Sequence, residues 1–121
     1  MRRYRGLTLR VLGRSAPPAM GPGKAELIDR IGQTGSISAA ARAMGMSYRR
    51  AWQLVEGLND TFSKPVVTTA IGGRQGGGAS VTPFGEYLVR QFRAMEEKAS
   101  KAIAADLRRF TVHLRKAKKH R

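Results

Sequence analysis

Two helical segments joined by very few residues limit most strongly what this chain can fold into. The stretch "SISAAARAMGMS" predicts a short helix with Ser38 as its N-cap and an end at Gly45. Ser47 is predicted to be a second N-cap, and "YRRAWQLVEGLNDTF" continues as a longer helix before Pro65. So short a connection makes the two helices neighbours in space, since the chain between them cannot span a larger gap.

Small residues around this connection favour a helix-turn-helix. Ala41 lets the first helix approach the second, Gly45 can take a positive φ in the turn, and Ala51 is expected to face back toward the first helix. An ordinary helical hairpin in a small bundle is the alternative, because a fold does not by itself determine a function.

The remaining segments complete a mainly α fold. "LTLRVL" predicts a short strand from Leu7 to Leu12, and "KAELIDRIGQTG" predicts a helix that Gly35 stops. The β-prone segments "VVTTAI" and "ASV" flank a run of glycines, and Thr82 and Pro83 open a last helix.

We therefore expect a winged helix-turn-helix that is mainly α with a small β wing. Its expected parts are a basic arm, short strand and connector (1–22), the winged helix-turn-helix (23–82), a long dimerisation helix (83–110) and a basic tail (111–121).

The charge of the chain indicates an anionic partner. It has 23 Lys and Arg residues against 8 Asp and Glu, which gives a formal net charge of +15. So much like charge opposes compaction unless it is neutralised, and nucleic acid is the usual partner of so basic a domain. An anionic membrane surface is the alternative, but no apolar run reaches the ~18 residues that span a bilayer, and Arg10 interrupts the apolar segment near the N-terminus. We expect no membrane partner and a cytoplasmic location, with which the absence of cysteine is compatible.

The exposed side of the second helix is expected to carry groups that suit base edges. At ~100° per residue, Ser47, Arg49, Arg50 and Gln53 fall opposite the apolar side in its first turns. Arg pairs with guanine and Gln with adenine through two parallel hydrogen bonds, and a recognition helix reads bases mainly through its N-terminal turns. A solvated charged face is the alternative.

The two aromatic residues of this helix have two interpretations each. Tyr48 falls on the apolar side, where it can pack inward or extend its hydroxyl to a phosphate. Trp52 lies at the edge of that side and is expected to be core, with base stacking as the alternative.

Five glycines in seven positions form the second candidate element: Gly72, Gly73, Gly76, Gly77 and Gly78. A P-loop needs Gly-Lys-Ser/Thr before a helix, and a dinucleotide loop needs a different glycine spacing, so neither fits. A hairpin after a helix-turn-helix is a wing, whose glycines allow a sharp turn and a close approach to phosphate. Arg74 can then enter the minor groove or pair with phosphate. A solvent-exposed loop is the alternative. The candidate DNA-binding residues are Ser38, Ser47, Tyr48, Arg49, Arg50, Gln53, Lys64, Arg74 and Gln75.

Apolar residues of the last helix form a stripe that is long for so small a domain. Its candidate dimer contacts are Phe84, Leu88, Phe92, Met95, Ala99, Ala102 and Ile103. Part of the stripe can cover the chain's own core, and the rest invites a second copy. A two-fold dimer presents two recognition helices to major grooves ~34 Å apart. A single amphipathic helix on its own core is the alternative.

No enzymatic constellation is visible. The chain lacks cysteine, and its two histidines, His113 and His120, lie near the C-terminus away from most of the carboxylates. This composition offers no triad, carboxylate pair or metal site, so we expect no enzyme.

Two longer segments carry a family resemblance. "GSISAAARAMGMSYRRAWQLVEGLN" and "GGRQGGGASVTPFGEYL" resemble the N-terminal DNA-binding domain of ModE-type molybdate-responsive transcription regulators, which are related to the LysR-type winged helices. The resemblance implies a domain that dimerises through a long helix and binds palindromic operator DNA. It places the recognition segment at Ser47–Gln53 and the wing tip at Gly72–Gly78.

The same resemblance bears on cofactors. Molybdate-responsive members carry C-terminal oxyanion-binding domains, whereas this chain ends at Arg121 in a basic tail, so we expect no cofactor. We expect a sequence-specific regulator that binds double-stranded DNA as a homodimer. A non-specific architectural DNA- or RNA-binding protein is the alternative.

Overall fold

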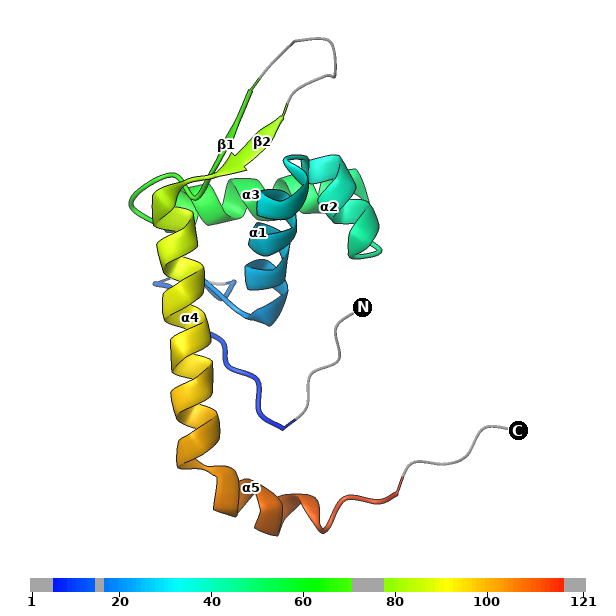
Figure 1. Cartoon of the computed structure of the whole chain (residues 1–121), viewed down its shortest axis with the longest axis vertical. Helices are drawn as coiled ribbons and strands as arrows, with labels where there is room; N and C mark the ends of the chain where they lie inside the picture. The colour runs from blue at the N-terminus through cyan, green and yellow to red at the C-terminus, as the bar shows by residue number, and fades with distance from the viewer. Residues whose placement is uncertain (1–5, 15–16, 71–77, 117–121) are drawn as a thin grey trace, which may run out of the picture.

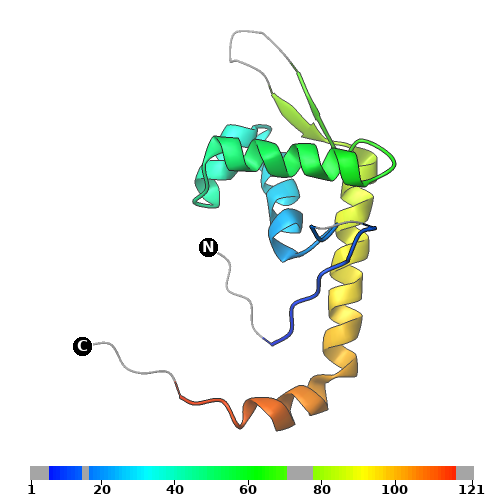
Figure 2. The ribbon, with the colours of Figure 1, turned by 180° about the vertical axis from the view of Figure 1, so that it is seen from behind.

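The computed structural model of the chain describes residues 6–14, 17–70 and 78–116, and in these ranges it has five helices and two strands (Figure 1). The elements are α1 (Pro22–Thr34), α2 (Ile37–Ala43), α3 (Tyr48–Thr61), β1 (Val67–Thr69), β2 (Ala79–Val81), α4 (Pro83–Ala102) and α5 (Ala104–Thr111). The first three helices pack together, and from behind α3 crosses in front of α1 (Figure 2). The mainly α fold with a small β wing is confirmed.

The junction of α2 and α3 has the predicted geometry. Gly45 takes a φ of 67°, and the backbone N–H of Met46 donates to the carbonyl of Ala41 at 3.0 Å. Ala41 and Ala51 are both buried, so the two backbones approach closely where their side chains are smallest. The expected helix-turn-helix is therefore present.

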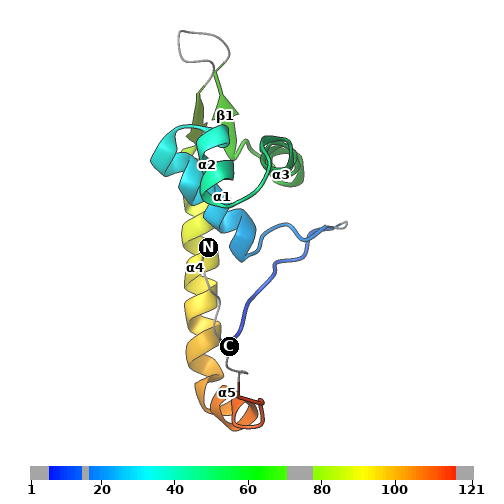
Figure 3. The same ribbon diagram turned by 90° about the vertical axis from the view of Figure 1, so that its right-hand side faces the viewer.

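The hairpin is fastened to α3 by one side chain. β1 and β2 pair antiparallel, with Val67 opposite Val81. Asn59 of α3 accepts from the backbone N–H groups of Val66 and Val67 at 2.7 and 3.2 Å, and its amide donates to the Val67 carbonyl at 2.9 Å. These bonds orient the hairpin relative to α3, and Figure 3 shows both at the same end of the molecule, with α4 running away from them.

The start of α4 is fixed against the same strand. Thr82 is the N-cap, as expected, and its hydroxyl accepts from the backbone N–H of Gly85 at 2.9 Å while it donates to the carbonyl of Pro65 at 2.7 Å. A Cβ at Gly85 would lie 2.5 Å from the carbonyl oxygen of Val66, so the helix and the residue just before β1 touch backbone to backbone.

The first half of α4 belongs to the chain's own core. Phe92 is buried with the apolar face of α1, and Arg93 makes ion pairs with Asp29 of α1 and with Glu96. Phe92 is therefore not available to a second copy, and Phe84 and Leu88 are half-buried against the same core. Met95 and Ala102, farther along α4, are exposed.

The N-cap predicted for α2 is wrong by two residues. Ser36 is the cap, and its hydroxyl accepts from the backbone N–H of Ala39 at 3.0 Å. Gly35 ends α1 with a φ of 69° and turns the chain at once, so the extended residue that a cap requires is the next one. Ser38 lies inside α2 and is half-buried.

The strand predicted from Leu7 to Leu12 is also wrong. The structure has a single antiparallel bridge there, in which the Val11 N–H donates to the Met20 carbonyl at 2.8 Å. Prolines at 17 and 18 have no backbone N–H to donate, so the facing segment cannot extend the ladder.

The last helix is shorter than predicted. α4 ends at Ala102, Ile103 leaves helical geometry with a φ of −107° and a ψ of 10°, and α5 continues in a new direction toward Thr111 (Figure 1). Phe92 is the last residue of α4 that is buried in the core. The turn brings Leu107 of α5 beside Gly6, where a Cβ would lie 3.0 Å from the Leu107 Cδ2 atom. None of the helices in these three described ranges is long and apolar enough to cross a membrane.

The backbone contact at Gly85 generates a stability prediction. Gly85→Ala should lower the free energy of unfolding by about 2 kcal/mol, because the added methyl must displace the Val66 carbonyl. Urea denaturation followed by circular dichroism measures it.

Gly57→Ala is the matched control. A Cβ at Gly57 in α3 meets nothing within 4 Å, so this change should raise the stability by up to about 1 kcal/mol through helix propensity. A Gly85→Ala protein as stable as the Gly57→Ala protein would show that the contact is not tight.

Candidate nucleic-acid interface

The N-terminal turn of α3 is held by its cap and by the residues it buries. The hydroxyl of Ser47 accepts from the backbone N–H of Arg50 at 3.1 Å. Ala51, Val55 and Leu58 point into the core at helical spacing. The polar residues between them are therefore held on the outer side of a rigid helix.

All five residues predicted for the start of this helix are exposed: Ser47, Tyr48, Arg49, Arg50 and Gln53. Among the residues that the structure describes, neither Arg49 nor Arg50 forms an ion pair. Both guanidinium groups are thus free to bind an anion or a base edge.

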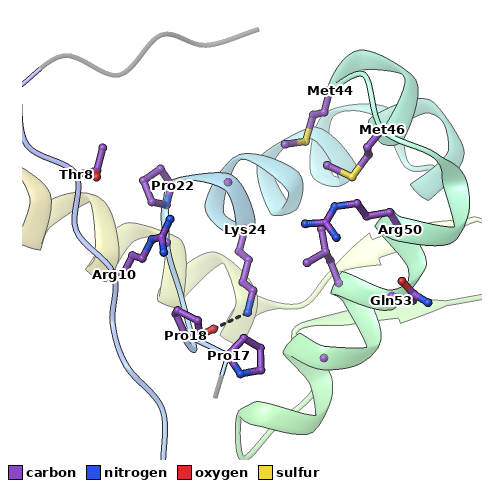
Figure 4. A pocket seen from close by; sticks show the side chains of 14 residues that line it. Thr8, Arg10, Pro17, Pro18, Pro22, Lys24, Met44, Met46, Arg50 and Gln53 are labelled. Carbon is purple, nitrogen blue, oxygen red and sulfur yellow. Dashed lines mark hydrogen bonds between the residues drawn. The ribbon is translucent and has the colours of Figure 1, made fainter. Parts of the chain in front are cut away.

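Adjacent arginines of α3 point to different surroundings. Arg50 and Gln53 line a groove of about 600 Å³ that also takes in the N-terminal segment and the start of α1 (Figure 4). Arg49 is not among the lining residues, and a step of ~100° along the helix turns it away from Arg50. The sequence grouped these side chains in one site, whereas the structure places Arg50 on a groove that Arg49 does not line; at ~100° per residue Gln53 falls between the two arginines.

The two aromatic residues form a stacked pair on the side of α3 that carries Asn59. The ring centroids of Tyr48 and Trp52 lie 6.5 Å apart with 15° between their planes. At ~100° per residue both fall within about 20° of Asn59, so they share the side of α3 whose Asn59 bonds β1. Tyr48 is 55% exposed, so of its two interpretations inward packing is wrong. The residue opens α3, before the buried stretch that begins at Ala51.

The other predicted DNA contacts are spread over several elements. Lys64 is exposed between α3 and β1, with its Nζ atom 5.8 Å from the centroid of the Phe84 ring. Gly78 is exposed, and its carbonyl accepts from the Ala70 N–H at 2.9 Å, which continues the hairpin by one pair. The predictions for Gly72, Gly73, Arg74, Gln75, Gly76 and Gly77 fall outside the described residues.

Sequence reasoning missed two cations that share the groove of Arg50. Arg10 comes from the N-terminal segment and Lys24 from the first turn of α1. Burial lowers the pKa of Lys24, whose ammonium donates to the carbonyl of Pro18 at 2.5 Å. No spacing along the chain signals this grouping, because only tertiary packing brings the three segments together. In the described part of the chain no His, Asp or Glu cluster is arranged to hold a metal ion.

Two curated relatives are similar in sequence to most of the chain. Over 86 residues it is 46% identical to the molybdenum-pterin-binding protein MopB of Rhodobacter capsulatus, covering 71% of this chain and 32% of that protein. Over 82 residues it is 33% identical to the DNA-binding transcriptional dual regulator ModE of Escherichia coli K12, covering 68% and 31%. The resemblance to ModE-type proteins is confirmed, and the chain spans about a third of the length of these relatives.

The fold and the family agree. The chain matches the structure of a CbnR_DBD–DNA complex with a TM-score of 0.54 and 15% identity, over 75% of this chain and 97% of that one, which shows a shared fold. The family model for bacterial regulatory helix-turn-helix proteins of the lysR family matches residues 24–86, from the first turn of α1 through the hairpin to the start of α4. This chain belongs to the lysR family of bacterial regulatory helix-turn-helix proteins.

Proposed function

We propose that this chain is a transcription regulator that binds double-stranded DNA sequence-specifically, with α3 in the major groove. The observation that carries the proposal is the exposed first turns of α3, which bear Arg49 and Gln53 on a helix held rigid by the helix-turn-helix. The lysR family consists of bacterial regulators, and the similar ModE protein is named a DNA-binding transcriptional dual regulator. The chain then acts by binding DNA in the cytoplasm rather than by catalysis.

The dimensions of the major groove of DNA fit this arrangement. A major groove ~12 Å wide admits one helix, whose N-terminal residues meet the base edges. The hairpin stands beside α3 because Asn59 bonds it there, so it meets the flank of the same site as a wing. Phosphate neutralisation by the many cations of the chain supplies affinity without sequence preference.

We also propose that DNA is bound by a homodimer. Met95 of α4 is 43% exposed and Phe110 of α5 is 70% exposed, beyond the half of α4 that the core covers. A second copy packed on this apolar surface removes it from water. The two-fold axis then relates two α3 helices that bind adjacent major grooves.

Arg49→Ala tests sequence-specific binding. Loss of a bidentate guanidinium–guanine contact should weaken binding to a selected duplex by ~1–3 kcal/mol and relax the base preference at one position. Fluorescence anisotropy with the selected duplex and with random duplex, without added metal or molybdate, measures both effects.

The control removes an equal charge elsewhere. Arg108 is exposed in α5, so Arg108→Ala should alter binding to selected and random duplexes alike. If Arg49→Ala also weakens both duplexes equally, or if RNA competes as well as DNA, the chain is a non-specific binder and the proposal fails.

Met95→Glu tests the dimer. A carboxylate in a buried apolar interface should shift the protein to monomer, as sedimentation velocity would show. Ala94→Glu places the same charge on an exposed neighbouring position of α4 and should leave the dimer intact.

Sequences selected from a random duplex pool should be palindromic, with half-sites about one helical turn apart. Selected sites without two-fold symmetry would contradict the dimer.

A further inference from the structure

The groove beside α3 has the size and lining of a small-molecule site. Its volume is about 600 Å³, and its walls come from three parts of the fold: the N-terminal segment, the first turn of α1, and α3 with the turn that precedes it (Figure 4). Clefts that bind small molecules have this size and combine apolar walls with a few convergent polar groups. The apolar part consists of Pro17, Pro18, Pro22, Met44, Met46 and Leu54.

Three cations line this groove with no acid to balance them. Arg10, Lys24 and Arg50 each come from a different segment, and none of the lining residues is Asp or Glu. Among the described residues, the ion pairs involve other cations. Like charges held around one concave, partly apolar surface repel one another, so an anion placed between them is stabilised.

The start of α1 adds to this positive field. Gly21 is the N-cap and offers no side chain to the first turn, which also contains no acidic residue. The unpaired N–H groups of a helix N-terminus carry partial positive charge, and Gly23 and Lys24 of this turn line the groove. Lys24 is partly desolvated, which disfavours its charged form until an anion is present.

We propose that this groove binds a small organic anion, with a carboxylate, sulfonate or phosphate group held by Lys24, Arg10 and Arg50 and an apolar body against the prolines and methionines. Inorganic phosphate would satisfy the cations but leave the apolar walls in water, whereas an amphipathic anion satisfies both. DNA backbone phosphate is the other source of the same anionic chemistry.

Arg50 links this site to the recognition helix. An anion that holds the Arg50 guanidinium in the groove withdraws it from any phosphate of bound DNA, so the anion and DNA oppose each other. This regulatory consequence depends on the DNA-binding function proposed above, whereas anion binding does not.

A dye pair tests the binding site. The probe is 8-anilino-1-naphthalenesulfonate, and N-phenyl-1-naphthylamine is the same apolar body without the sulfonate. We expect the sulfonate to shift the backbone amide NMR signals of Gly21, Gly23, Lys24 and residues 44–57 in a saturable way, and the neutral dye to bind at least about tenfold more weakly. Equal affinity for the two dyes, or shifts elsewhere in the chain, would overturn the proposal.

Variants that remove one positive charge test which residues bind the anion. Lys24→Gln should weaken sulfonate binding about tenfold, and Arg10→Gln, outside the helices, should act in the same direction. Lys98→Gln removes the same charge from an exposed position on α4 and should leave sulfonate binding unchanged. Equal effects of the Lys24 and Lys98 changes would show non-specific attraction to a basic protein and end the proposal.

Binding measurements with duplex DNA distinguish a small organic anion from DNA backbone phosphate as the occupant of the groove. With the dye absent, Lys24→Gln should change duplex affinity no more than Lys98→Gln does. With the dye at a concentration near its Kd for the unchanged protein, the duplex affinity of that protein should fall, and the duplex affinity of the Lys24→Gln protein should fall much less. If Lys24→Gln alone weakens duplex binding, the groove holds backbone phosphate and the small-anion site is wrong. If no duplex binds any variant, the proposed function fails while the dye measurements still decide the site.

Discussion

The backbone of Val66 is the point on which the rest of the structure depends. Its N–H donates to the Asn59 side chain of α3, its carbonyl accepts from the Thr82 N–H ahead of α4, and Gly85 packs directly on that carbonyl. The residue is fully buried, so each of these polar groups would be costly to leave unpaired. The α3 helix, the hairpin and the α4 helix are therefore joined through the backbone of one residue and cannot reorient independently.

Local signals in the sequence were sufficient for much of this fold. Caps at Ser47 and Thr82, and the positive φ of Gly45, depend on residues within one turn of the chain, so their chemistry can be recognised from sequence. Asn59 illustrates the opposite case. Its three hydrogen bonds reach residues seven and eight positions away across a chain reversal, and nothing in the local pattern distinguishes it from a solvated helix residue.

Two of the differences between prediction and structure, like Asn59, depend on contacts between distant segments. The end of α4 at Ala102 depends on where the core stops and on a contact between α5 and the N-terminal segment, and apolar periodicity reports neither. Arg49 and Arg50 are neighbours in sequence, yet the turn of the helix directs one outward and the other into a groove with Arg10 and Lys24. A helical wheel gives the direction of a side chain but not what a distant segment places opposite it.

The straightness of α4 has a mechanical consequence. Its twenty residues form a rod ~30 Å long that is rooted at the Val66 carbonyl and leaves the core after Phe92. A lever of that length converts a 10° tilt at its root into a displacement of about 5 Å at its far end. In a two-fold assembly built on the far ends, the separation of the two α3 helices would follow the packing around Gly85. Subtle repacking at this hinge would alter which half-site spacing is matched without altering any residue that touches a base.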